Sequence, residues 1–156
     1  MWHSTSIKRY KSILECCNIL PEPNIPNSER WSTSRGELHY PLVRHLGGVS
    51  LFDFDNFNPK AYSQKYPASS WRTFVPNRKG WDETVWIKIN RLKTIDKLIN
   101  GADLVKKWKG ENLYTHKFMP IIECAHLGAL PTSSFDNVLV YNTNSERFIK
   151  YIPEDT

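Results

Sequence analysis

Hydrophobic residues recur at helical spacing near the start of the chain. Ile7, Tyr10, Leu14 and Cys17 share one face of a helix. Hydroxyl side chains at positions 4–6 can accept hydrogen bonds from the unpaired N–H groups of a first helical turn. Three prolines between positions 21 and 26 prevent the helix from continuing. The pattern therefore predicts a first helix that begins after residue 6 and ends at Asn18.

Several later stretches carry the pattern of strands, either alternating or apolar on both faces. They cover residues 49–54, 84–89, 119–124, 138–141 and 146–151. The last two are separated by a polar tetrapeptide and predict a hairpin. Short helices are expected at 94–98 and 102–108, and long irregular stretches at 21–47 and 60–80. This order of elements predicts an α+β fold with a mostly antiparallel sheet.

Length and composition agree with one folded catalytic domain over residues 1–156. The chain is 40% hydrophobic and 24% charged, which excludes disordered and collagen-like classes. No apolar run approaches the roughly 20 residues that span a bilayer, and the N-terminus has no apolar signal core. Three cysteines without a CxxC pair predict free thiols. We therefore expect a cytoplasmic protein without a membrane or disulfide-linked partner.

Basic and aromatic residues alternate in several places. The net charge is +5, the pI is near 9.1, and aromatic residues make up 13% of the chain. Cations that neutralise phosphates, next to rings that stack on bases, are what a nucleic-acid groove uses. The same aromatic residues can equally be core anchors with basic neighbours at the surface. The candidates for a nucleic-acid surface are Lys8, Arg9, Lys107 and Lys109.

An acidic residue inside an apolar stretch is the first candidate for chemistry. Glu123 lies within residues 121–125, whose other members are Ile, Ile, Cys and Ala. Burial of an unpaired carboxylate is costly, so its position needs a reason. Glu123 either faces solvent on an edge strand or faces a cleft with a partner. In the second case it is a candidate general base or a group that stabilises a cation.

Two further groups of residues are candidates for binding. His3 precedes the first helix, whose N-terminus suits phosphate or ribose hydroxyls, although helix capping alone also explains the hydroxyl residues there. Asp53 and Asp55 lie two positions apart on the predicted strand and could hold a divalent metal. No histidine or third carboxylate at a suitable spacing completes that site, and Asp55 can simply open a turn. We therefore expect no metal.

Three segments together resemble the ADP-ribosyltransferase fold. The chain opens with Trp2-His3-Ser4-Thr5 before a helix containing Ser12-Ile13-Leu14-Glu15, continues through the strand at 49–54, and ends with Pro120-Ile121-Ile122-Glu123 before Leu130-Pro131. The closest likeness is to the DarT-like branch, which modifies DNA bases. In that branch an aromatic-His-x-Thr motif opens the chain beside a helix ending in Ile-Leu-Glu. A late strand glutamate then precedes a Val-Pro or Leu-Pro turn.

The resemblance implies a role for each matched residue. His3 and Thr5 would contact the ribose of a bound nucleotide, Ser50 or Phe52 would line the pocket beside its base, and Glu123 would be the catalytic carboxylate. Asp53, on the same predicted strand, is a further candidate for the nucleotide site. The branch has an arginine just after its second strand. Here residues 55–59 read Asp-Asn-Phe-Asn-Pro, so Arg44, as a catalytic residue, or Arg72, in the nucleotide site, would have to supply the cation.

The function implied by the resemblance is an enzyme that acts at an N-glycosidic bond, with DNA as its substrate. Cleavage of a C1′–N bond places positive charge on the sugar, which a carboxylate stabilises. The reaction would be base excision without a cofactor, or ADP-ribosylation of DNA with NAD, in a toxin or an anti-phage factor. Two alternatives remain open. One is a non-catalytic nucleic-acid-binding module, and the other is a metal-dependent nuclease that uses Asp53 and Asp55.

Overall fold

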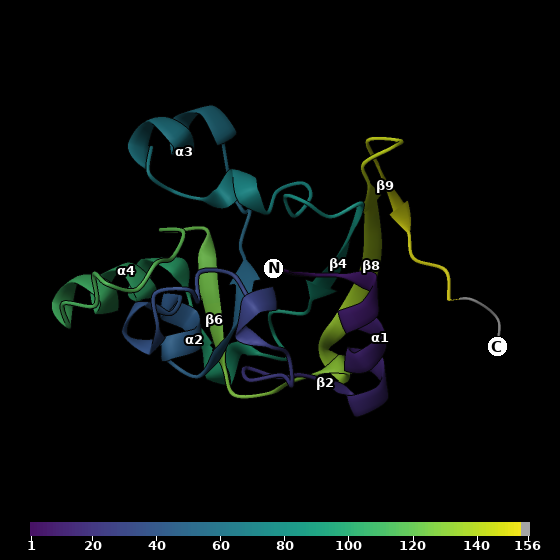
Figure 1. Cartoon of the computed structure of the whole chain (residues 1–156), viewed down its shortest axis with the longest axis horizontal. Helices are drawn as coiled ribbons and strands as arrows, with labels where there is room; N and C mark the ends of the chain where they lie inside the picture. The colour runs from purple at the N-terminus through teal and green to yellow at the C-terminus, as the bar shows by residue number, and fades with distance from the viewer. Residues whose placement is uncertain (154–156) are drawn as a thin grey trace.

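The computed structural model describes residues 1–153, which form α-helices, strands and short 3-10 turns (Figure 1). The helices are α1 (Ile7–Cys16), α2 (Leu42–His45), α3 (Pro59–Lys65) and α4 (Gly101–Gly110). The strands are β1 (Trp2–Thr5), β2 (Asn18–Ile19), β3 (Gly48–Phe52), β4 (Glu83–Ile89), β5 (Leu98–Ile99), β6 (Glu123–Leu127), β7 (Leu130–Pro131), β8 (Phe135–Asn142) and β9 (Arg147–Lys150). The 3-10 turns are η1 (Asn27–Glu29), η2 (Glu37–His39), η3 (Trp71–Thr73), η4 (Ile95–Lys97) and η5 (Thr132–Ser134).

A seven-stranded sheet organises the fold, in the order β5-β6-β3-β1-β4-β8-β9. Strands β2 and β7 form a separate small pair. All the strand pairs of the described residues are antiparallel, which confirms the predicted α+β class with a mostly antiparallel sheet. The first strand of the chain lies in the middle of the sheet, so residues next to the N-terminus have neighbours from distant parts of the sequence.

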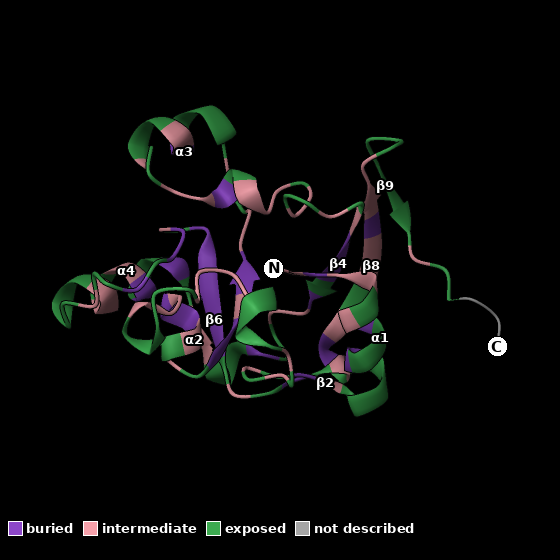
Figure 2. Cartoon of the chain, viewed as in Figure 1, coloured by how far each residue is buried: buried purple, intermediate pink, exposed green. Residues whose placement is uncertain are grey.

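Apolar side chains cover both faces of the sheet. On one face, Tyr10 and Ile13 of α1 pack against Leu51 and Ile87. On the other face, an aromatic cluster includes Phe52, Tyr62, Trp71 and Trp86. A third cluster joins α2 and α4 to β6, which is buried along most of its length (Figure 2). The alternation of side chains along β3 therefore places Leu51 on the first face and Ser50 and Phe52 on the second.

Elements with strong local signals are confirmed. Helix α1 begins after Ser6, whose side chain accepts a hydrogen bond from the Arg9 amide, and ends at Cys16, two residues earlier than predicted. Strand β4 and helix α4 cover the predicted segments. The predicted hairpin is present as β8 and β9, which pair from Asn142 and Arg147 outward. Periodic apolar residues and capping side chains act over a few residues, so a local pattern is enough to find them.

Two features near the candidate site differ from the prediction. Residues 2–5 precede α1 as expected, but they also form a strand that was not predicted, β1, because β3 and β4 offer hydrogen-bonding edges on both sides. The strand predicted at 119–124 begins only at Glu123. Pro120 has no N–H for a sheet, and Ile121 has a positive φ of 69°, so this part of the chain turns before β6. Glu123 is therefore the first residue of its strand.

The structure differs from the predicted secondary structure in other places, where the sequence is polar and the helices and strands are short. The irregular stretch at 21–47 contains η1, η2 and α2, and the stretch at 60–80 overlaps α3, which Asn58 caps and Pro59 opens. The helix expected at 94–98 is the turn η4 followed by β5. Strand β3 ends at Phe52, so Asp53 and Asp55 lie beyond it and not on one strand face as predicted.

The described residues contain no helix that is long and apolar enough to cross a membrane.

Candidate active site

The carboxylate of Glu123 is held by two hydrogen bonds in a buried position. Ser50 Oγ on the neighbouring strand donates to Oε1 over 2.7 Å, and the Met119 amide donates to Oε2 over 2.7 Å. Only 3% of the residue is exposed. Burial raises the pKa of Glu123 to about 7, although both hydrogen bonds favour the ionised form and oppose the rise. The group can therefore hold or release a proton near neutral pH.

The backbone just before Glu123 is strained. Ile121 is β-branched and has a φ of 69°, a conformation that such residues rarely adopt. Its carbonyl oxygen packs against the first residue of α4, where a Cβ built on Gly101 would lie 1.8 Å from it. Strained residues of this kind persist where the surroundings impose them, and they cluster at functional sites. The turn and α4 together fix the position of Glu123.

Tyr62 of α3 lies over the same turn. Its hydroxyl donates to the Pro120 carbonyl oxygen over 2.8 Å and lies 3.1 Å from Ser69 Oγ. Burial raises the pKa of Tyr62 to about 12, and the negative charge of Glu123 contributes to the rise. Tyr62, Met119 and Ile122 belong to one buried cluster on this face. A substrate that reaches Glu123 must displace part of this cover.

His3 lies where strands β1 and β3 separate. Among the described residues the two strands share one register pair, Trp2 with Phe52, whereas β1 and β4 share four. His3 Nδ1 lies 3.0 Å from the Ser50 carbonyl oxygen. Because a carbonyl can only accept, Nδ1 carries the hydrogen and Nε2 remains an acceptor. Burial lowers the pKa of His3, and the charge of Arg9 lowers it further, so the ring is neutral at pH 7.

Ser50 connects the two candidates from opposite sides. Its carbonyl oxygen faces His3, and its hydroxyl binds Glu123. Strand alternation assigns His3 and the buried Thr5 to the α1 face, and Ser50, Phe52 and Glu123 to the aromatic face. The structure thus places the predicted residues on three adjacent strands, β1, β3 and β6. His3 and Thr5 therefore lie on the opposite face of the sheet from Glu123, and the structure does not bring the three together on one face.

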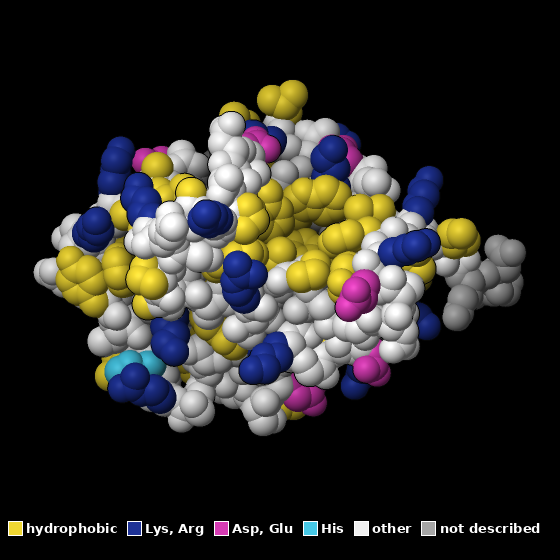
Figure 3. Space-filling view, turned by 90° about the horizontal axis from the view of Figure 1, so that it is seen from above, with side chains coloured by type: hydrophobic (Ala, Val, Ile, Leu, Met, Phe, Trp, Pro, Cys, Tyr) yellow, Lys and Arg dark blue, Asp and Glu magenta, His cyan; other side chains and the backbone are white. Residues whose placement is uncertain are grey.

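An apolar hollow opens on the aromatic face near this site. Phe52 is 4% exposed and stacks on Phe54 at 5.4 Å between ring centroids. Phe54 and Trp86 then form part of a cavity of about 210 Å³. Seen from above, hydrophobic side chains form the hollow and lysine and arginine side chains lie around it (Figure 3). The cavity is lined by Trp2, Phe54, Val75, Trp86, Leu139 and Phe148.

The two aspartates after β3 share one arginine. Arg91 Nη2 donates to Asp53 Oδ2 in a short hydrogen bond and lies 3.7 Å from Asp55 Oδ2. Asp53 Oδ1 also accepts from the Asp55 amide over 3.1 Å. These carboxylates therefore have a cationic partner. The described part of the chain contains no cluster of three or more side chains suited to a metal ion.

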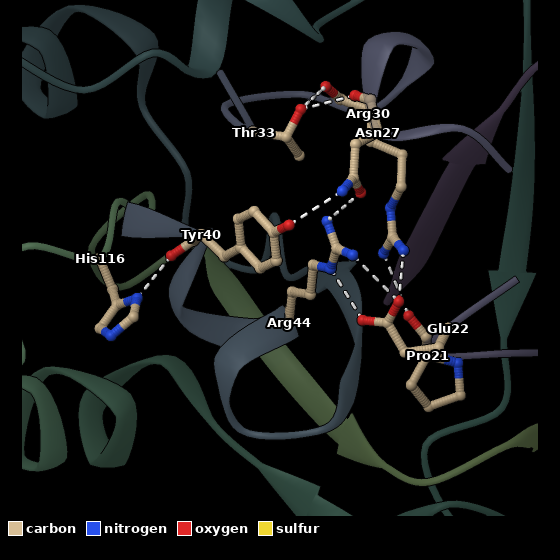
Figure 4. A network of polar contacts seen from close by, with 8 residues as sticks. All are labelled: Pro21, Glu22, Asn27, Arg30, Thr33, Tyr40, Arg44 and His116. Carbon is tan, nitrogen blue, oxygen red and sulfur yellow. Dashed lines mark hydrogen bonds and ion pairs between the residues drawn. The ribbon is translucent and has the colours of Figure 1, made fainter. Parts of the chain in front are cut away.

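Arg44, expected as a catalytic cation, is bound within a polar network (Figure 4). Its Nε donates to Glu22 Oε1 over 2.8 Å, and its guanidinium lies 3.9 Å from the ring centre of Tyr40. Arg30 binds the same glutamate. The network attaches the segment after α1 to α2. Arg44 is not among the causes that set the pKa of Glu123.

The other basic candidates do not gather into one surface. Arg72 is exposed and lies over the ring of Trp71 at 4.4 Å. Helix α1 carries Lys8 and Arg9, and α4 carries Lys107 and Lys109 at the opposite end of the view in Figure 1. Lys107 is also paired with Glu111.

Sequence reasoning missed two arginines. Arg91 forms an ion pair with Asp53. It follows the predicted strand at 84–89, and the acidic pair Asp53 and Asp55 favours a cation nearby, so these two features together could have made Arg91 a candidate. Arg78 lies over the ring of Phe74 at 4.6 Å, and its Nη1 atom is buried without a hydrogen-bond partner. No sequence pattern singled out Arg78, because its neighbours come from α1 and from the segment after α3.

Comparison of the chain with protein-family models, curated proteins and solved structures finds no match, so its own residues carry the functional argument.

Proposed function

We propose that the chain is an enzyme that acts at an N-glycosidic bond with DNA as its substrate, and that Glu123 is its catalytic carboxylate. The observation that carries the proposal is a glutamate that is 3% exposed and has a pKa of about 7. A buried glutamate with a purely structural role is expected beside a cation. No cation of the described residues is among the causes that set its pKa, and such poised groups are typical of active sites.

The chemistry follows from the charge that develops on the sugar. When the C1′–N bond breaks, the base leaves with the bonding electrons and the sugar becomes cationic. Ionised Glu123 would stabilise this cation, or would accept a proton from the attacking group. Ser50 would orient the carboxylate through its 2.7 Å hydrogen bond. His3, on the opposite face, would act by holding the Ser50 backbone through its 3.0 Å hydrogen bond.

An ADP-ribosyltransferase-like fold is part of the same proposal. The segments that carry the resemblance place His3 on β1, Ser50 on β3 and Glu123 on β6, which are adjacent strands of the sheet. Ser50 meets Glu123 on one face of the sheet, whereas His3 lies on the other face and is linked to them through the Ser50 backbone carbonyl. A biological role as a toxin or an anti-phage factor belongs to this proposal as well.

Two reactions use this chemistry and differ in their need for NAD. In base excision, water adds to C1′ and the base leaves protonated, without a cofactor. In the transferase reaction, the C1′–N bond of NAD would break, nicotinamide would leave with the bonding electrons, and the ADP-ribose group would become attached to a DNA base that gives up a proton. Residues that fit a phosphate-bearing ligand are present, because Arg78 Nη1 is buried without a partner. Arg78 and Arg9 would hold such a group, and they leave Glu123 to act on the sugar.

The test is incubation of the purified protein with normal and modified-base DNA, with and without labelled NAD. Strand breakage after alkali in the absence of NAD identifies base excision, and label on the DNA identifies a transferase. Glu123→Gln should abolish either product, whereas Glu15→Gln, an exposed glutamate on α1, should retain it. A folded Glu123→Gln variant that keeps full activity would disprove the role of Glu123.

The apolar hollow favours a second candidate, a non-catalytic nucleic-acid-binding module. The strand register places exposed Lys88 and Lys150 on the same face as Trp86 and Leu139, so cations flank a surface on which bases could stack. In that case Glu123→Gln would leave DNA binding intact. Lys88→Gln and Lys150→Gln would weaken binding and reduce its dependence on salt.

A further inference from the structure

Arg78 presents a cation that the described residues leave without an anion. Its Nη1 atom is buried and has no hydrogen-bond partner. Its guanidinium lies over Phe74, 4.6 Å from the ring centre, and no carboxylate of residues 1–153 forms an ion pair with it. Buried donors in folded proteins are almost always satisfied. Arg78 as a whole is only partly buried, so a partner from outside the chain can reach its guanidinium.

The backbone around Arg78 is firmly held. Its amide donates to Thr84 Oγ1 over 2.9 Å, and its carbonyl oxygen accepts from the Trp81 amide and from the Asn77 side chain. Asn77 binds the Trp81 carbonyl oxygen as well. These bonds fix the turn at 77–81 at the start of β4. The guanidinium is thus presented from a rigid base, which is the arrangement expected of a preorganised binding group.

A second cation, Arg9 of α1, approaches the same turn. Its guanidinium lies 5.8 Å from the ring centre of Trp81. Its Nη2 donates to the Glu29 backbone carbonyl over 2.7 Å, but the Glu29 carboxylate is 4.0 Å away, at the limit of an ion pair. The charge of Arg9 and, more strongly, burial lower the pKa of Arg78. The positive charges of Arg9 and Arg78 therefore repel each other, and the only carboxylate paired with either of them among the described residues is that of Glu29.

The two glutamates that pair with the neighbouring arginines are already engaged. Glu22 binds both Arg30 and Arg44, and Arg30 adds further positive charge that Arg9 feels. Arg30 and Arg44 thus share Glu22, Arg9 has the Glu29 carboxylate at 4.0 Å, and Arg78 has no carboxylate partner among the described residues. Like charges repel unless an anion lies between them, so the surplus charge favours an anionic ligand.

We propose that Arg9 and Arg78 form a binding site for the phosphate or diphosphate group of a nucleotide. A guanidinium fork matches phosphate oxygens and can donate two parallel hydrogen bonds. Phe74 connects this site to the proposed active site, because its ring lies 6.1 Å from the ring of Phe52, which pairs in register with Glu123. The anion site stands on its own geometry, and its assignment to a nucleotide rests on the proposed function.

The experiment measures thermal unfolding with sodium pyrophosphate, inorganic phosphate and ADP, each at the same ionic strength set with sodium chloride. A ligand that binds the folded state raises Tm with its concentration. We expect pyrophosphate and ADP to raise Tm in the wild-type chain. Arg78→Gln and Arg9→Gln should weaken binding at least 10-fold, since each loses charge-assisted hydrogen bonds. Arg147→Gln, which removes an exposed charge on β9, is the matched control and should behave as wild type.

Several outcomes decide the proposal. No rise in Tm at constant ionic strength, or equal affinity in wild type and both arginine variants, would overturn it. Arg78→Lys serves if Arg78→Gln fails to fold, because it keeps the charge but loses the fork, and it should bind more weakly than wild type. ADP binding tighter than pyrophosphate supports a nucleotide, and equal affinities support a site for the diphosphate group.

Glu123→Gln separates this proposal from the proposed function. The variant should still bind pyrophosphate with wild-type affinity, because its change lies outside the anion site. Activity retained in Glu123→Gln would overturn the catalytic role alone. Pyrophosphate binding that is absent from a chain with Glu123-dependent activity would overturn the anion site alone.

Discussion

Ser50 Oγ and Glu123 Oε1 lie 2.7 Å apart, although the two residues are 73 positions apart in the sequence. The serine donates across the adjacent strands β3 and β6 to a carboxylate that burial would otherwise protonate more strongly. The Met119 amide supplies the second donor. The glutamate is therefore poised between its two protonation states.

Removal of the serine hydroxyl should shift this balance. Ser50→Ala takes away a donor that favours the ionised form, so the pKa of Glu123 should rise above about 7. Loss of the bond to a buried charged group should destabilise the fold by about 1–3 kcal/mol at pH 8. An NMR titration of the glutamate side-chain carbonyl carbon measures the pKa. Ser12→Ala, at an exposed position of α1, should change neither quantity. An unchanged or lower pKa in Ser50→Ala would refute this account of the site.

Glu123 should also make stability depend on pH. Its folded pKa of about 7 lies above the ordinary value of 4.5, so the folded state holds the proton more tightly than the unfolded chain. The stability from this group is fully present below pH 4.5 and is lost as pH rises to about 7.

Comparison with Glu123→Gln isolates that contribution. Urea unfolding measures the free energy of unfolding at pH 5 and pH 8. Relative to wild type, this free energy should be higher for the variant at pH 8 than at pH 5, by up to about 3 kcal/mol. Glu15→Gln should track wild type at both pH values. If the difference between Glu123→Gln and wild type is the same at pH 5 and pH 8, then Glu123 does not titrate in this range.

Close packing between α4 and the turn before Glu123 predicts opposite effects at the two glycines of that helix. A Cβ on Gly101 would lie 1.8 Å from the Ile121 carbonyl oxygen, so Gly101→Ala should destabilise the chain by about 1–3 kcal/mol or more. Gly110 has open space around it, and Gly110→Ala should be neutral or stabilising by up to about 1 kcal/mol. Urea denaturation measures both. Equal effects at the two positions would contradict the packing.

The ion pair after β3 should be modest in energy and independent of metal. Asp53→Asn, Arg91→Gln and the double variant form a cycle, for which we expect a coupling of about 1 kcal/mol, since Arg91 is partly exposed to solvent. EDTA should leave any DNA-directed activity unchanged. Loss of activity with EDTA that Mg²⁺ restores would favour the nuclease alternative built on Asp53 and Asp55.

Part of the candidate site could be predicted from the sequence, because an ionisable side chain in an apolar stretch is recognisable without knowledge of the fold. Glu123 was identified as a carboxylate in an apolar stretch, which is costly wherever it is buried. The strand boundary was wrong, because the apolar pattern does not reveal that Ile121 turns the chain. Arg44 illustrates the opposite case. Its charge made it a candidate, but its partners Glu22, Asn27 and Tyr40 come from a segment whose path no periodicity describes.

The sequence by itself determined the elements whose causes are local. The cap at Ser6, the apolar face of α1, the β-formers of β4 and the hairpin of β8 and β9 all depend on residues a few positions apart. The tertiary structure alone decided that β1 lies between β3 and β4, that Ser50 meets Glu123, and that Arg78 lies near Arg9. These relationships depend on strand order and register, which arise from the packing of the whole sheet.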